Sequence, residues 1–160
     1  MSQSSTRRNF LKLSGTLATA VAPAALLPSS AQAAVSVKIT SLKELKPLDP
    51  VSFNYPGSAA AVLIDMGAPA LHGVGPRKSV VAFSSLCQHM GCPAQFDARS
   101  KLLVCGCHGS EYDPGSDGRV IEGPSTRGLP RIRLNVASDG TIPATGVVNG
   151  VVYGRANNDA

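Results

Sequence analysis

The sequence predicts an all-β protein assembled from many short strands. The 160-residue chain contains 16 glycines and 12 prolines, which mark turns between short β-type runs. A two-residue hairpin signal, Asn149-Gly150, lies near the carboxyl end. Hydrophobic residues make up 43% of the chain, enough for the core of one domain, but aromatic residues only 4%. We therefore expect a core made mainly of Val, Ile, Leu and Ala.

Four strands are expected in the first half of the chain. Residues 35–40 alternate apolar and polar side chains, as half-buried strands do. Residues 51–55 and 60–66 form the next two strands, with a Pro-Gly turn between them. Residues 67–78 are rich in glycine and proline and form a loop. The β-branched segment 79–84 is the fourth strand.

Four more strands are expected in the second half. Residues 113–118 form a turn, and the short segment 119–122 after it is a strand. Residues 131–136 alternate apolar and polar side chains and end at a Ser-Asp-Gly hairpin turn. Segments 141–148 and 151–154 close the chain as two strands joined by the Asn-Gly hairpin.

The first 33 residues have the features of a twin-arginine export signal. Arg7 and Arg8 stand in the run Thr-Arg-Arg-Asn-Phe-Leu-Lys. A mildly apolar segment, 13–27, follows, and small residues at 31–33 suit cleavage before Ala34. Because twin-arginine export carries folded proteins, we expect the domain 34–160 to reach the periplasm with a cofactor already inserted. If the signal is retained, it would instead hold the chain at the membrane.

The net charge of +5 does not indicate a nucleic-acid partner. Three of the positive charges, on Arg7, Arg8 and Lys12, belong to the expected signal. From Ala34 onward, 12 Lys and Arg face 10 Asp and Glu, which leaves +2. No interleaving of basic and aromatic residues supports nucleic-acid binding.

The chemistry of the chain is concentrated between residues 87 and 112. All four cysteines and two of the three histidines lie there, in two similar boxes. These potential ligands are Cys87, His89, Cys92, Cys105, Cys107 and His108. The residue types allow a zinc site on the two Cys-His pairs, a redox dithiol at Cys105 and Cys107, two disulfides, or a [2Fe–2S] cluster with mixed ligands.

The spacing of the two boxes resembles that of the Rieske iron–sulfur family. The boxes are Cys-Gln-His-Met-Gly-Cys and Cys-Gly-Cys-His-Gly-Ser-Glu-Tyr, with fifteen residues between His89 and Cys105. The resemblance implies a [2Fe–2S] cluster with two thiolates on one iron and two imidazoles on the other. The implied ligands are Cys87 and Cys105 for the first iron and His89 and His108 for the second.

The resemblance also implies a fold and a covalent link. The expected fold is an antiparallel β-sandwich or barrel base with a small cluster-binding subdomain of two loops, at about residues 85–130. Cys92 and Cys107 match the disulfide that joins these loops in many family members. It would close a loop of about 15 residues and stabilise the fold by roughly 3 kcal/mol. Imidazole ligands would place the reduction potential at about −150 to +300 mV.

Two further residues match positions that tune the cluster in higher-potential family members. By this resemblance, the Ser110 hydroxyl bonds a bridging sulfide and the Tyr112 hydroxyl bonds the sulfur of Cys87. Such hydrogen bonds stabilise the reduced cluster and raise its potential. Residues 123–130 resemble the proline-bearing loop that covers the cluster, but they depart from its common Gly-Pro-Ala-Pro form.

Beyond the cluster motif itself, the whole exported part of the chain resembles the small subunit of arsenite oxidases. The stretches that carry this resemblance are 50–56, 73–76, 81–84, 89–93, 129–131 and 152–155. It implies a heterodimer in which a larger molybdopterin and iron–sulfur subunit oxidises arsenite. Electrons would pass through this chain to a cytochrome c or an azurin-like copper protein. The chain alone would carry no substrate chemistry. The alternative is the Rieske subunit of a quinol-oxidising cytochrome bc-type complex.

Overall fold

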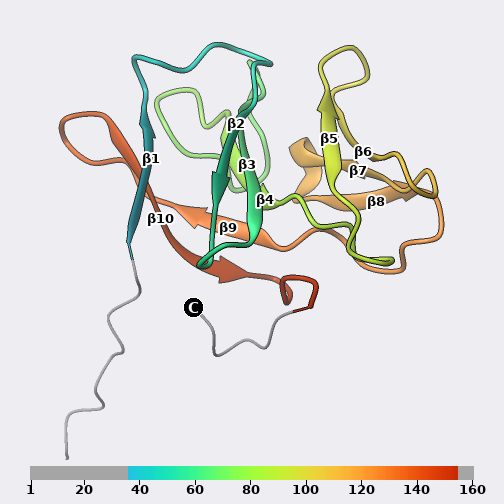
Figure 1. The fold of residues 1–160 in the computed structure, drawn as a ribbon. Helices are drawn as coiled ribbons and strands as arrows, with labels where there is room; N and C mark the ends of the chain where they lie inside the picture. Colours follow the sequence, from blue (N-terminus) through green and yellow to red (C-terminus); the bar gives the residue numbers. More distant parts are fainter. Residues whose placement is uncertain (1–35, 155–160) are drawn as a thin grey trace, which may run out of the picture. The chain divides into compact units, whose positions relative to one another are not determined.

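A computed structural model describes residues 36–154, and this part of the chain is almost entirely β-structure (Figure 1). The expected signal, 1–33, lies outside the described residues. The strands are β1 Val37–Ser41, β2 Val51–Asn54, β3 Ala60–Asp65, β4 Val80–Ser84, β5 Ala94–Asp97, β6 Leu102–Cys105, β7 Glu111–Asp113, β8 Arg119–Glu122, β9 Arg131–Leu134 and β10 Thr141–Val148. One short 3₁₀ helix, Pro114–Ser116, follows β7.

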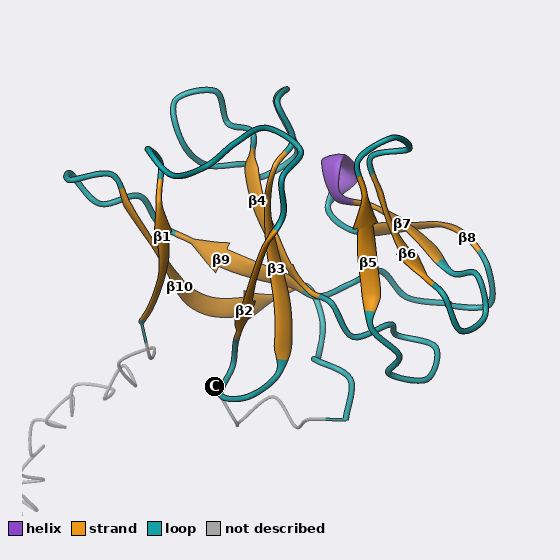
Figure 2. Ribbon diagram, turned by 45° about the horizontal axis from the view of Figure 1, so that its top comes forward, coloured by secondary structure: helices purple, strands orange, loops and turns teal. Residues whose placement is uncertain are grey.

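The strands form two antiparallel sheets (Figure 2). The larger sheet has six strands in the order β1-β10-β9-β4-β3-β2, and the smaller has four in the order β5-β6-β7-β8. The six-stranded sheet is the base, and the four-stranded sheet belongs to the small cluster-binding part. This arrangement confirms the all-β prediction. No helix between residues 36 and 154 is long and apolar enough to cross a membrane.

Strands β3 and β4 are buried on both faces. On one face, side chains such as Ile64 and Phe83 pack with Leu103 and Tyr112 of the smaller sheet. On the other face, alternate residues such as Leu63 pack against β9 and β10 within the base. This double burial explains why both strands are almost continuously apolar rather than alternating.

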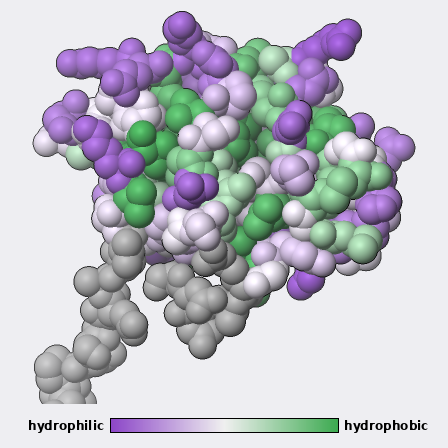
Figure 3. Space-filling view, in the orientation of Figure 1, coloured by the Kyte–Doolittle hydropathy of each residue, from purple (hydrophilic) through white to green (hydrophobic). Residues whose placement is uncertain are grey.

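On the face shown in Figure 3, strongly hydrophilic residues gather at the upper rim and apolar residues show between them.

The smaller sheet was only partly predicted. Strands β5, β6 and β7 fall inside the window that was expected to consist of loops. Each has only three or four residues, and the cysteines, glycines and turn residues around them obscure the alternation that marks a strand. The two expected loops are present, but a four-stranded sheet carries them.

The predicted final strand at 151–154 is wrong, because the Asn-Gly pair does not start a hairpin. Asn149 instead binds two other elements. Its Oδ1 accepts a hydrogen bond from the N–H of Arg131, and its Nδ2 donates to Asp117. The chain then turns away from β10, so the last described residues have no partner strand, although Val152 is buried.

Candidate metal centre

The two cysteine-histidine boxes lie at the same end of the smaller sheet. The first box connects β4 to β5, and the second begins at the end of β6. Because β5 and β6 are antiparallel, Ala94 at the start of β5 pairs with Cys105 at the end of β6. Sheet register thus brings together residues that lie about fifteen positions apart in the sequence.

Each box forms a loop of its own, and the two loops have the same conformation. In the first, the N–H of Cys87 donates to the carbonyl of Cys92, five residues on, at 2.8 Å. In the second, Cys105 makes the equivalent bond to Ser110 at 2.8 Å. Each cysteine carbonyl also accepts from a glycine four residues on, Gly91 or Gly109. Both glycines have positive φ, +78° and +73°, a conformation that a residue with a Cβ adopts only at a cost.

The residues present fit a cluster with mixed ligands. Cys87 and Cys105 are not in a disulfide, and each is 1% exposed. The imidazoles of His89 and His108 meet edge to face with centroids 4.8 Å apart. Among the described residues, Nδ1 of His89 is buried with no hydrogen-bond partner. A buried nitrogen of this kind is costly unless something binds its lone pair. Two free thiols and two imidazoles are the donor types of a Rieske cluster.

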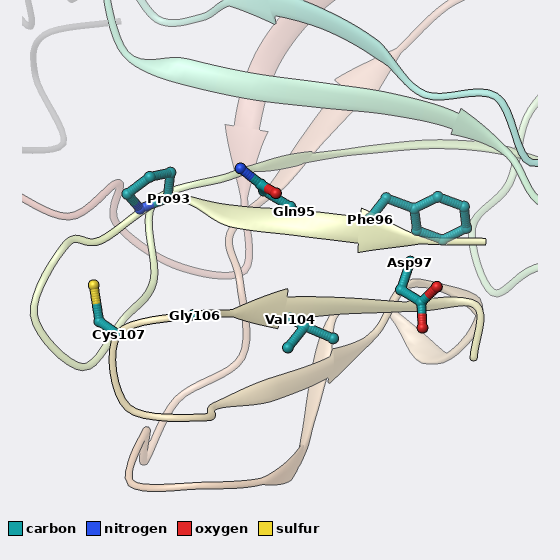
Figure 4. Close-up of a pocket in the computed structure, with 7 residues that line it drawn as sticks. All are labelled: Pro93, Gln95, Phe96, Asp97, Val104, Gly106 and Cys107. Atoms are coloured by element: carbon teal, nitrogen blue, oxygen red, sulfur yellow. The ribbon is translucent and has the colours of Figure 1, made fainter. Parts of the chain in front are cut away.

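Cys92 and Cys107 form a disulfide that joins the two loops. The sulfurs of Cys92, Cys105 and Cys107 lie within 4.8 Å of one another. A cysteine binds a metal as its thiolate, so of these three only Cys105 can bind iron while the disulfide is intact. Cys107 lies at one end of an open groove lined by Pro93, Gln95, Phe96, Asp97, Val104, Gly106 and Cys107 (Figure 4).

Hydrogen bonds favour the thiolate form of Cys87. Burial raises the pKa of its thiol, but the Tyr112 hydroxyl and the backbone N–H of His89 lower it, followed by the Cys105 thiol and the Ser110 hydroxyl, and the net pKa is below the usual value. The oxygen of Tyr112 lies 3.0 Å from Sγ of Cys87 and accepts from the N–H of Gln88 at 3.2 Å. A thiolate has no hydrogen to give, so with Cys87 in that form the phenol donates its own hydrogen to the sulfur.

Cys105 responds to the same surroundings in the opposite direction. Burial raises the pKa of the Cys105 thiol, and the neighbouring Cys87 raises it further. The backbone N–H groups of Cys107 and His108 oppose this rise. Burial likewise raises the pKa of Tyr112, as does its bond to Cys87, so the phenol stays protonated and able to donate.

A third loop, residues 123–130, closes over the second box. Ser110 is fully buried, and its Oγ accepts a hydrogen bond from the N–H of Ser125. Sequence reasoning identified Ser110 and Tyr112 but not Gln88 or Ser125, both of which are buried and contact them. The departure from Gly-Pro-Ala-Pro at position 125 was the one sequence signal for Ser125.

Comparisons with known proteins agree with this geometry. The family model described as a Rieske [2Fe-2S] domain matches residues 35–133. The chain is 39% identical to "Iodate reductase subunit IdrB" of Denitromonas iodatirespirans, over 96% of this chain and 86% of the relative. It is 38% identical to the subunit of the same name from Pseudomonas sp. (strain SCT), over 92% and 81% of the two chains.

A solved structure has the same fold. The soluble domain of the Rieske protein II (soxF) from Sulfolobus acidocaldarius superposes with a TM-score of 0.63 and 25% sequence identity. The match covers 71% of this chain and 78% of the other.

Proposed function

The chain belongs to the Rieske [2Fe-2S] family, and from this premise we propose how its residues hold the cluster and which enzyme it serves. It is an electron-transfer subunit of an oxidoreductase. Its cofactor is a [2Fe–2S] cluster, which when bound accepts and releases one electron at a time. The observation that carries the proposal is the donor set of two buried free thiols beside two facing imidazoles.

We propose that the buried thiols, Cys87 and Cys105, hold one iron and that His89 and His108 hold the other. Replacing a ligand should abolish cluster binding, measured as iron content and as the electron paramagnetic resonance (EPR) signal of the reduced protein. Cys87→Ala and His108→Ala are the test variants. His72→Ala is the matched control, because His72 is the third histidine, is exposed and belongs to neither box. A normal EPR signal in His108→Ala would contradict the ligand set.

The hydroxyls of Ser110 and Tyr112 are proposed to raise the reduction potential. The support is the burial of both hydroxyls and the 3.0 Å contact of the Tyr112 oxygen with Sγ of Cys87, because a hydrogen bond to sulfur stabilises the more negative, reduced state. Tyr112→Phe and Ser110→Ala should each lower the midpoint potential in protein-film voltammetry. An unchanged midpoint in both variants would exclude this role.

The proposed partner is a larger molybdopterin and iron–sulfur subunit that oxidises arsenite. The resemblance of the flanking stretches to arsenite oxidase small subunits supports this reaction. Electrons would then leave through this chain to a cytochrome c or an azurin-like copper protein. A second candidate is iodate reduction, in which electrons flow toward the larger subunit. It is favoured by similarity over nearly the whole chain to proteins named as iodate reductase subunits.

One purification separates these candidates. The tagged chain is isolated from its native cells, and the co-purifying proteins, molybdenum content and activities are measured. For the arsenite enzyme, we expect a larger molybdenum-containing chain and arsenite-dependent reduction of cytochrome c. Consumption of iodate with a viologen donor, without arsenite oxidation, would favour the second candidate. Co-purification with a b-type cytochrome would instead favour a bc-type complex.

The proposed location is the periplasm, reached by twin-arginine export. This rests on residues 1–33, outside the described part of the chain. The intact mass of the periplasmic protein should correspond to a start near Ala34. Replacing Arg7 and Arg8 with Lys should leave the protein in the cytoplasm. A retained amino-terminal segment in the membrane fraction would support the anchored alternative.

A further inference from the structure

Ser125 is a buried polar residue in an exposed loop. It is only 6% exposed, whereas its neighbours Pro124, Thr126 and Arg127 are exposed. A hydroxyl is buried at a cost unless its hydrogen bonds are satisfied. The hydrogen bonds of Ser125 must therefore offset the cost of burying this polar side chain.

Two hydrogen bonds of Ser125 offset that cost. Its Oγ donates to the carbonyl oxygen of Arg127 at 2.9 Å, which closes the loop on itself. Its N–H donates to Oγ of Ser110 at 3.2 Å, which ties the loop to the second box. The side chain thus holds the loop in the shape in which its backbone reaches Ser110.

The bond from Ser125 determines where Ser110 can donate. A serine hydroxyl has one hydrogen to donate and accepts through its oxygen. Because the oxygen of Ser110 accepts from Ser125, its own hydrogen is left to donate to another partner, which under the proposed function is a sulfur of the cluster site. Without the bond from Ser125, the Ser110 hydroxyl would be able to turn its hydrogen toward a different partner.

Gly123 shows how closely the third loop lies on the second box. A Cβ on Gly123 would come within 2.5 Å of Cα of Ser110 and 2.6 Å of the carbonyl oxygen of Gly109. Its φ is +90°, a conformation that favours glycine. The two backbones are therefore in direct contact, and a change in the third loop is transmitted to Ser110.

We propose that Ser125 is a positioning residue that raises the reduction potential by fixing the direction of the Ser110 hydroxyl. This inference rests on the proposed ligand set and on the tuning role of Ser110. The third loop then not only covers the second box but also influences the reduction potential, through the side chain of Ser125.

The test measures midpoint potential, the EPR spectrum of the reduced protein and melting temperature in matched variants. Ser125→Ala keeps the N–H but loses the bond to Arg127. It should lower the midpoint potential by less than Ser110→Ala does and change the EPR g values. Ser125→Thr keeps a hydroxyl and should have a midpoint potential close to that of the wild type. Thr126→Ala, the exposed neighbour in the same loop, should leave the potential unchanged. In a Ser110→Ala background, Ser125→Ala should add no further shift.

The outcomes separate this inference from the proposed function. If Ser110→Ala shifts the potential and Ser125→Ala does not, the inference is overturned and the proposed tuning stands. An equal Ser125→Ala shift with and without Ser110 also overturns it, because the effect would then bypass Ser110. A lower melting temperature with an unchanged potential shows a purely structural role and overturns it. No shift in either single variant overturns both statements.

Discussion

The base sheet and the smaller sheet are held together by different forces. In the base, β3 and β4 have six and five residues, nearly all buried, with apolar cores on both faces. In the smaller sheet, the strands have three or four residues, and β8 at its edge is mostly exposed. The base can rely on apolar burial, which stabilises by about 25 cal/mol per Å², whereas the smaller sheet offers little area of this kind.

The smaller sheet compensates with covalent and polar links. Its fully buried apolar side chains include Leu103 and Tyr112, and around them stand the candidate ligands, the disulfide and the repeated loop hydrogen bonds. Apolar packing tolerates small displacements, but directed bonds hold the thiols and imidazoles in one geometry. The difference implies that the smaller sheet opens before the base. Four experiments test this comparison.

The largest effect is expected where the two sheets share a core. Phe83 of β4 is fully buried in the cluster that contains residues from both sheets. Phe83→Ala should cost about 3–5 kcal/mol in the free energy of unfolding, measured in urea. Phe53→Ala, a partly buried residue of edge strand β2, is the control and should cost less. A cost below that of the control would refute a shared core.

Removing the disulfide should weaken mainly the smaller sheet. The Cys92→Ala/Cys107→Ala double variant frees a loop with a sequence separation of 15, worth about 3 kcal/mol. Replacing both residues avoids leaving one reactive thiol beside Cys105. Amide hydrogen exchange should become faster in β5 and β6 and stay close to native in β3 and β4. Equal acceleration in both sheets would show that they open as one unit.

A smaller effect is expected at the contact between the first box and the carboxyl end. A Cβ on Gly91 would lie 2.5 Å from the Tyr153 ring, and Gly91 has a φ of +78°. Gly91→Ala should therefore cost about 1–2 kcal/mol from the backbone, with a further loss from the ring contact. Adding Tyr153→Ala should recover only the stability lost to the ring contact, measured by thermal unfolding. If no stability is recovered, the Tyr153 ring moves aside in Gly91→Ala at no cost.

The smallest effect concerns an ion pair in the base. Burial raises the pKa of Asp65, but Ser79, the N–H of Gly67 and Arg77 bring it below its usual value. Because the folded pKa is below the unfolded value of about 3.9, Asp65 stabilises the fold fully above that pH. This stability, about 1 kcal/mol, is lost as the pH falls through the folded pKa.

The pH dependence can be measured by melting temperature between neutral and strongly acidic solution. Asp65→Asn should melt lower at neutral pH and lose less stability on acidification than the wild type. Asp49→Asn, at an exposed position, is the control and should behave like the wild type. If the melting temperature of Asp65→Asn falls on acidification as much as that of the wild type, other carboxylates account for the acid sensitivity.

The chemistry of the site and the class of fold can be predicted from the amino-acid sequence alone. The box spacing implied a Rieske cluster, and the family comparison confirms it. The alternating runs and turns predicted an all-β base, which the sheets confirm. Both signals are local, because a loop with two ligands and a strand with one buried face are written within a few consecutive residues.

Which distant residues meet, in contrast, depends on the three-dimensional fold. It turned the Asn149-Gly150 pair from a hairpin into a contact with Arg131 and Asp117. It built a four-stranded sheet under the two boxes and placed Ser125 against Ser110. These outcomes depend on strand register and on loops fifteen or more residues apart, and register is set by the partner strand and the shared core rather than by the segment itself.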